Sequence, residues 1–234
     1  MLVDIFSTFD DQNQVFMSFY FLMWVYSFVV IMLFSSSLWV SSMSWIWVIN
    51  TMKDTISGQI FRSFGVNLGG FLNLITGLFL FLIFVNLSGL IPYVFSPTSH
   101  LVVSFSLGFP LWLSLILSGV RHNLSSVIAS LLPMGAPFLL NPFLVIIETV
   151  SIMVRSITLS VRLIANMSAG HIVLTLIGNY LMAGVFSSVI SMFVLGLVQV
   201  LYTVFEFGIS LIQAYIFCLL ITLYSDDHPH DSGF

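Results

Sequence analysis

Long apolar runs constrain this chain more than any other feature of its sequence. Each of five runs reaches the roughly 20 residues that a helix needs to cross the hydrocarbon of a bilayer. They are residues 15–34, 71–95, 101–120, 142–177 and 180–224. Helices are expected because lipid offers no hydrogen bonds to an open backbone, and the alternating pattern of a membrane barrel is absent. The sequence predicts an all-α integral membrane protein with about five transmembrane helices in one domain, residues 1–234.

Composition supports the same class of protein and excludes several others. Of the 234 residues, 59% are hydrophobic and only 6% are charged, against roughly 25% charged in a soluble domain. The net charge is −4 and no basic run is present, so we expect the chain to lie in lipid and not to bind nucleic acid. Cys218, the single cysteine, lies in an apolar stretch and is predicted to be a small buried hydrophobe. We therefore expect no metal, no cofactor and no disulfide.

The few basic side chains predict the orientation of the chain, because Lys and Arg in short loops favour the inside compartment. Lys53 and Arg62 follow the first apolar run, and Arg121 follows the third. Both segments should face the inside, which leaves the N-terminus outside and returns the acidic tail, residues 225–234, to the inside. Residues 38–65 are too short and too polar to span, so they are predicted to form an interfacial amphipathic helix.

Three prolines, Pro133, Pro137 and Pro142, prevent one helix from running out of the third span into the fourth, so a boundary is predicted near Asn141. The helix that follows would be about 50 Å long and the last one about 65 Å. Both exceed the roughly 30 Å of a hydrocarbon core. The sequence leaves two alternatives open, steep tilting of these long helices or a break near Gly196.

Charged residues inside the fourth run are expensive in lipid, so each needs a partner or a function. Glu148, Arg155 and Arg162 recur at seven-residue intervals and project from nearly one face of a helix. Arg155 has Glu148 available as an ion-pair partner. Arg162 has no acidic residue on its own turn and cannot lose its proton. Its counter-charge must therefore come from another helix.

Small residues accompany Arg162 along its face, namely Ala165, Asn166 and Ala169. Such a strip lets another helix approach closely, although ordinary helix packing explains small residues as well. A partner helix that carries a carboxylate would neutralise the arginine.

A second set of polar residues connects the fourth run with the fifth. His171 follows Arg162 by nine residues and so points to the opposite face of the helix. Glu206 lies in the last run with Gln199 and Gln213 seven residues away on either side, which makes a polar stripe. His171 and Glu206 are both titratable groups and are predicted to be partners.

Three stretches carry a resemblance to a known family: "LVIIETVS" at 144–151, "SVRLIANMSAGH" at 160–171 and "LIQAYIFCLLITLY" at 211–224. Together with "SGLIPYVFSPTSHL" at 88–101, they resemble subunit a of the F-type ATP synthase in its mitochondrial form. The resemblance is specific over about residues 140–224. It implies that the last two helices form a long, strongly tilted hairpin against a ring of c subunits.

The resemblance also implies roles for the polar residues. Arg162 would separate two aqueous half-channels that carry protons to and from the c-ring carboxylates. The motif positions of the family correspond to Asn166 and Gln213, while Ala165 and Ala169 would face the ring. Glu148 would line the inside path, and His171 and Glu206 the outside path. Arg155 and Gln199 are possible auxiliary residues.

The implied partners are the c-ring, a b-type peripheral stalk and small membrane subunits. The implied location is the mitochondrial inner membrane. The N-terminus of the chain would face the intermembrane space and its C-terminus the matrix. The chain has no phosphate-binding loop, so it is not expected to be an enzyme by itself. From the residues alone, a self-contained ion channel or secondary transporter stays as the alternative. Such a protein should carry its own carboxylate near Arg162.

Overall fold

The computed structural model of the chain describes residues 44–91, 96–131, 140–185 and 188–226, together with the single residues Phe9, Val25 and Phe28. Across these ranges all regular secondary structure is helical. The helices are α2 (Ser44–Ile60), α3 (Phe71–Gly89), α4 (Leu101–His122), α5 (Leu124–Ser130), α6 (Asn141–Val185) and α7 (Val189–Asp226), with the 3-10 turns η3 (Phe64–Asn67) and η4 (Pro97–Ser99).

Four helices, α3, α4, α6 and α7, are long and apolar enough to cross a membrane. The predicted all-α membrane architecture is therefore confirmed. The predicted first span, residues 15–34, lies outside the described residues except for Val25 and Phe28, as does most of the acidic tail.

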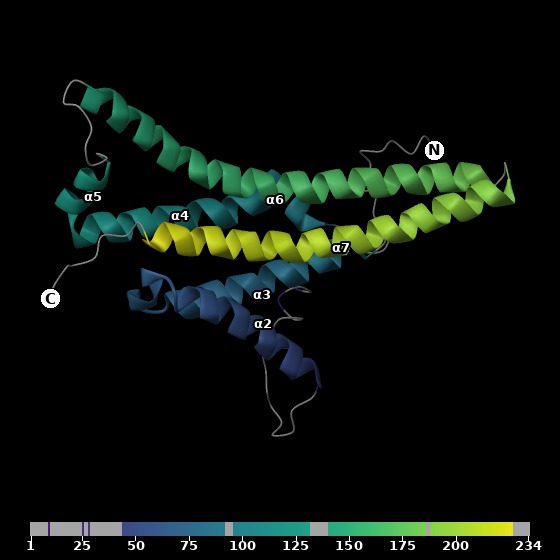
Figure 1. The fold of residues 1–234 in the computed structure, drawn as a ribbon, viewed down its shortest axis with the longest axis horizontal. Coiled ribbons are helices and arrows are strands. Elements are labelled where there is room, and N and C mark those ends of the chain that lie inside the picture. The colour runs from purple at the N-terminus through teal and green to yellow at the C-terminus, as the bar shows by residue number, and fades with distance from the viewer. Residues whose placement is uncertain are drawn as a thin grey trace.

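The two longest helices form an antiparallel hairpin. α6 has 45 residues and α7 has 38, which corresponds to about 65 Å and 55 Å. They run side by side, and the tip of the hairpin projects beyond α3 and α4 (Figure 1). α7 passes through Gly196 without interruption, so the alternative of a break there is wrong.

The start of α6 agrees with the sequence prediction, whereas the turn between α6 and α7 lies elsewhere than predicted. α6 begins at Asn141, where the prolines place the boundary. The predicted turn near residues 178–180 is wrong, because α6 continues through Gly178 to Val185. The start of α7 is fixed instead by Ser188, whose hydroxyl accepts a hydrogen bond from the Ser191 backbone N–H at 3.3 Å.

The amphipathic segment predicted at 38–65 contains a helix, α2, over a shorter range. Ile49, Ile56 and Ile60 recur on one face of α2 and are buried. Ile56 and Ile60 join a core of α3, α6 and α7 side chains that includes Phe79, Leu163, Phe217 and Ile221. On another face, Trp47 is 70% exposed. The core therefore ties α2 to the base of the hairpin.

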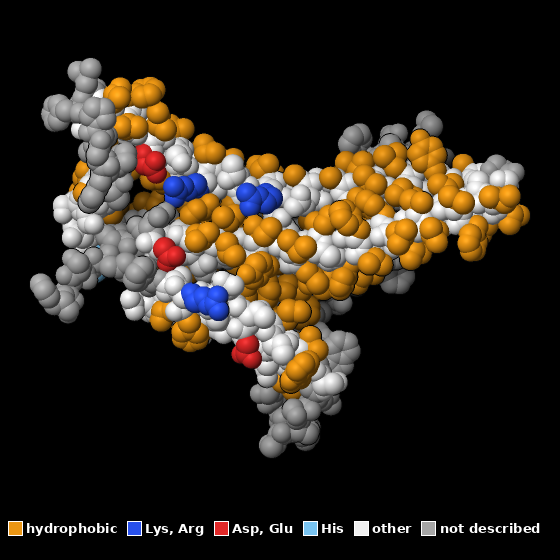
Figure 2. All heavy atoms as spheres, in the orientation of Figure 1, with side chains coloured by type: hydrophobic (Ala, Val, Ile, Leu, Met, Phe, Trp, Pro, Cys, Tyr) orange, Lys and Arg blue, Asp and Glu red, His pale blue; other side chains and the backbone are white. Residues whose placement is uncertain are grey.

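Charged side chains are unevenly distributed over the surface. On the face shown in Figure 2, they gather over the half of the molecule away from the hairpin tip, while the tip is covered by apolar side chains. Arg121 lies in the last turn of α4, at the same end as the C-terminus of α7 (Figure 1). The sequence rule for basic residues assigns this end to the inside compartment.

Close packing of α4 on α6 depends on Gly108. A Cβ placed on Gly108 would lie 3.1 Å from Leu159 Cδ2 and 3.8 Å from Ser160 Cβ. We therefore expect Gly108→Val to lower the free energy of unfolding by about 1–3 kcal/mol. Thermal unfolding of the assembled complex measures this. The matched control is Gly77→Val on α3, where a Cβ meets nothing within 4 Å; equal losses in both variants would contradict the packing argument.

Candidate functional site

The first part of the site is an ion pair near the base of the hairpin. Arg155 Nη2 lies 3.6 Å from Glu148 Oε1, and the two side chains are 36% and 38% exposed. The Arg155 guanidinium also lies over the ring of Tyr224, 5.7 Å from its centroid. The predicted pairing of Glu148 with Arg155 is confirmed, and the arginine also links α6 to the end of α7.

Arg162 occupies a different environment two turns further along α6. Its side chain is exposed, and Ala165 and Ala169 are exposed on the same side of the helix. No carboxylate among the described residues lies within the 4.0 Å ion-pair distance of Arg162. The side of α6 that carries the arginine is therefore open to a partner that brings a negative charge.

A hydrogen bond joins the two hairpin helices beside this open side. Asn166 Nδ2 donates to Gln213 Oε1 at 2.7 Å. Gln213 is 2% exposed, whereas Asn166 is half-buried between the open side and the helix interface. The amide pair fixes the register of α6 on α7 next to Arg162.

Glu206 is buried where the hairpin helices cross closely. The side chain is 1% exposed, and its carboxyl group lies against the backbone of Gly170 on α6. Neither carboxylate oxygen makes a hydrogen bond of standard geometry within the described part of the chain. The hydroxyl of Tyr202, one turn earlier on α7, approaches the carboxyl group without meeting that geometry. The absence of a side chain at Gly170 is what admits Glu206 between the helices.

The predicted pairing of His171 with Glu206 is wrong. The His171 Nε2 atom is buried and has no hydrogen-bond partner among the residues described, and the ring meets Phe9 edge-on at 6.5 Å. Glu206 points at Gly170, and the next residue on a helix is rotated by about 100°. The imidazole therefore lies on a different side of α6 from the Glu206 carboxyl group, and no hydrogen bond joins the two groups.

The polar stripe on α7 continues toward the hairpin tip with Gln199. Its side chain is half-buried, and its Oε1 atom is buried without a partner in the described segments. Gln199, Glu206 and Gln213 thus all bury polar atoms, as their seven-residue spacing predicts.

One residue of this region escapes the sequence reasoning. Asn86 on α3 is fully buried, and its Nδ2 donates to the backbone oxygen of Ser210 at 3.4 Å. Ser210 follows Glu206 by one turn of α7. The sequence does contain a signal for Asn86, because a polar side chain inside the apolar run 71–95 is expensive in lipid and so indicates a partner or a function. Its hydrogen bond to Ser210 places Asn86 beside the polar stripe of α7.

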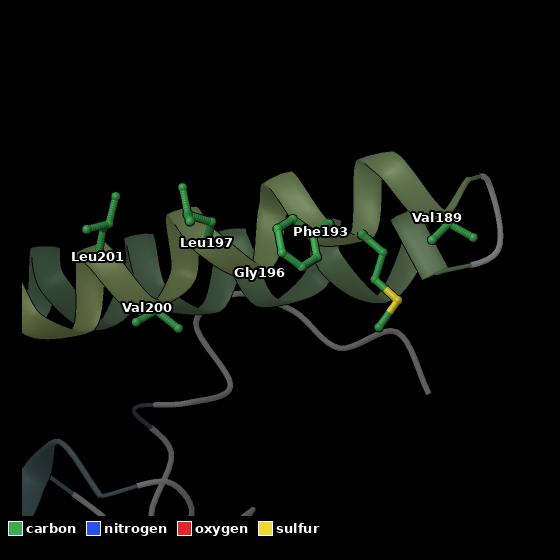
Figure 3. A pocket seen from close by; sticks show the side chains of 7 residues that line it. Val189, Phe193, Gly196, Leu197, Val200 and Leu201 are labelled. Atoms are coloured by element: carbon green, nitrogen blue, oxygen red, sulfur yellow. The ribbon is translucent and has the colours of Figure 1, made fainter.

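A hollow lies on the outer surface of α7, near the hairpin tip. Figure 3 shows Gly196 between Phe193, Leu197 and Val200, where the missing side chain leaves an open groove. Every side chain that lines it is apolar, so it holds no group for proton chemistry. In the described ranges, no three His, Cys, Asp or Glu side chains gather to hold a metal ion.

The fold and the site define a multi-pass helical membrane protein that keeps charged and amide side chains within its longest helices. Comparison with known proteins identifies it further. A family described as "ATP synthase A chain" matches residues 15–226. ATP synthase subunit a of Locusta migratoria is 36% identical over 231 residues, which cover 97% of this chain and 99% of that protein. The chain belongs to the ATP synthase subunit a family.

Other relatives agree. ATP synthase subunit a of Drosophila melanogaster is 37% identical over 232 residues, covering 97% of this chain and 99% of that protein. ATP synthase F(0) complex subunit a of Halichoerus grypus is 41% identical over 155 residues, covering 66% and 69%.

Proposed function

We propose that this chain is the proton-translocating stator subunit of the Fo sector, which passes protons to and from the carboxylates of a c-subunit ring and so couples proton flow to rotation. Family membership supports a role in the membrane sector of the ATP synthase, in ATP synthesis and in proton transport. The observation that carries the finer proposal is Arg162, exposed on α6 beside Ala165 and Ala169 with no carboxylate within 4.0 Å among the described residues.

The chemistry follows from the cost of charge in lipid. A ring carboxylate is protonated while it faces lipid, because an unpaired anion there is expensive. When it reaches Arg162, the guanidinium stabilises the anion and the proton is released. Arg162 itself stays charged and repels protons, so it prevents the two aqueous half-channels from joining into a leak. Each proton that crosses supplies about 2.3 kcal/mol per 100 mV of membrane potential.

The other site residues then divide between the two half-channels. Glu148, with Arg155, would line the inside path roughly 21 Å from Arg162 along the helix. His171 and Glu206, with Gln199 as an auxiliary, would line the outside path. The Asn166–Gln213 hydrogen bond supports this division, because it joins α6 to α7 at a position between the two groups of residues.

The assembly follows from the same proposal. The chain would contact the c-ring, a b-type peripheral stalk and small membrane subunits of the mitochondrial inner membrane. The N-terminus would face the intermembrane space and the C-terminus the matrix, as the basic residues favour. The chain would bind no nucleotide itself. A self-contained channel or transporter is the weaker alternative, because it would need its own carboxylate beside Arg162.

Cross-linking to the ring tests this proposal. We expect Ala169→Cys to form a disulfide with a cysteine placed near the c-subunit carboxylate, because Ala169 is exposed within about 20° of Arg162 around α6. The measurement is the fraction of subunit a cross-linked to subunit c in oxidised membranes, with a several-fold excess over background expected.

Ile157→Cys is the matched control. Ile157 is also exposed, at 50%, but lies roughly 140° around α6 from Arg162. Equal cross-linking from both positions, or a greater yield from Ile157→Cys, would contradict the proposal that the Ala169 side of α6 faces the ring.

A further inference from the structure

The 3-10 turn η4 and the residue before it, in the connection between α3 and α4, bury three polar side chains. η4 contacts α3, α4 and α6. Ser96, Thr98 and Ser99 are at most 9% exposed, and Thr98 is fully buried. The two serines bond within the turn, where Ser99 Oγ donates to the Ser96 backbone oxygen at 2.6 Å. The hydroxyl of Thr98 has no partner in the part of the chain that the structure describes.

This turn lies beside the part of the hairpin that holds Glu206. A Cβ placed on Gly89 would lie 3.0 Å from Ser96 Cβ and 3.8 Å from Met167 Cε, so α3, the turn and α6 meet there. Met167 is one turn before Gly170, against which the Glu206 carboxyl group lies. The turn therefore approaches α6 within about one helical turn of the Glu206 site.

Asn86 connects the same region from α3. It is one turn before Gly89, and its Nδ2 donates to the backbone oxygen of Ser210, one turn after Glu206. Its Oδ1 atom is buried and unpartnered among the described residues, like Thr98 Oγ1 and both oxygens of Glu206.

These four oxygen atoms belong to η4, α3 and α7, and both η4 and α3 contact the hairpin. In folded proteins, buried polar atoms are nearly always hydrogen-bonded, to protein or to ordered water. Burying several such atoms in one region without hydrogen bonds would raise the free energy of the folded state. A polar site with two to four donors and acceptors is the kind that holds buried water.

We propose that η4 is a water-binding site of the outside path, in which the Thr98 hydroxyl holds a water that leads past Asn86 to Glu206. This proposal rests on the proposed proton-translocating function and adds the route of access. A hydroxyl both donates and accepts hydrogen bonds, so it suits a chain of waters. Each water in the chain accepts one proton and releases one, and Glu206 takes and returns the transferred proton, so nothing is consumed.

Removing only the hydroxyl group tests the water site. Thr98→Val keeps the shape of the side chain and should reduce driven proton flux through the assembled complex about tenfold, the effect of one lost hydrogen bond on a barrier. Thr98→Ser keeps the hydroxyl and should restore the flux. The control is Thr222→Val, a position 6% exposed whose hydroxyl already donates to Leu219 O at 2.7 Å. Unchanged flux in Thr98→Val, or equal impairment in Thr98→Ser, overturns the proposal.

Access of a small cation to the same position gives a second measurement. Thr98→Cys should make driven flux sensitive to Ag⁺ added on the intermembrane-space side, because Ag⁺ binds thiolates and enters water-filled paths. The unmodified chain is the control, since Cys218 is fully buried in the apolar core. Insensitivity of Thr98→Cys would overturn the water site and leave the proposed function intact. Retention of driven flux by Arg162→Ala would instead overturn the proposed function.

Discussion

Replacing Gly170 by valine is expected to lower the free energy of unfolding by roughly 3 kcal/mol, the upper end for overpacking a filled interface. A Cβ at this position would overlap the carboxyl group of Glu206, whose side chain is 1% exposed. The hairpin helices must separate, or Glu206 must leave its site. Driven proton flux should fall by an order of magnitude or more, and thermal unfolding of the complex measures the stability.

The chain provides its own control for this substitution. Gly178 lies on the same helix, and a Cβ there meets nothing within 4 Å, so Gly178→Val should be nearly neutral. The double variant Gly170→Ala with Glu206→Asp shortens the carboxylate while adding the methyl group. It should regain part of the stability lost by Gly170→Ala alone. Equal stability of Gly170→Val and Gly178→Val would contradict the described contact.

Helical periodicity and the high cost of charge in lipid explain what could be predicted from the sequence. Apolar runs longer than a bilayer identify four of the spans, and prolines place the start of α6 at Asn141. Seven-residue spacing puts Glu148 next to Arg155 and leaves Arg162 without a partner on its own helix. These relationships lie within one helix, where sequence distance determines geometry.

Relationships between helices could not be predicted in the same way. His171 and Glu206 are compatible in chemistry, yet the rotation of α7 against α6 directs Glu206 to Gly170 instead. That rotation is set by the packing of many side chains, which spacing within one helix does not contain. Asn86 was missed for the same reason, because its partner Ser210 is 124 residues away.

The position of the hairpin turn shows a further limit. Gly178 resembles a helix end in a soluble protein, but in lipid an interruption leaves backbone groups without hydrogen bonds. Glycine is accordingly common within membrane helices. α6 continues past Gly178 and ends at Val185, and the Ser188 side chain supplies a cap to α7.

Arg162→Ala is expected to reduce driven proton flux roughly a hundredfold or more, the typical loss when one preorganised group that stabilises a developing anion is removed. The ring carboxylate would lose the cation that allows it to release its proton. Because the Arg162 side chain is exposed and makes no ion pair within the described residues, its removal should leave the fold and the assembly of the complex intact.

Arg155→Ala is the comparison for this variant. Arg155 pairs with Glu148, and both side chains are about one-third exposed, so losing the pair should cost little in stability. Its effect on flux should be clearly smaller than that of Arg162→Ala. Arg155→Ala also shows whether removing any arginine from α6 impairs transport.

The central claim is that Arg162 separates the two half-channels and discharges the ring carboxylates. The most direct test is to measure driven and passive proton flux across membranes that contain the assembled complex, with Arg162→Ala beside Arg155→Ala. The account predicts that driven flux is lost only in Arg162→Ala, with the c-ring still bound and passive flux equal to or above that of the unmodified complex. Normal coupling in Arg162→Ala would contradict it.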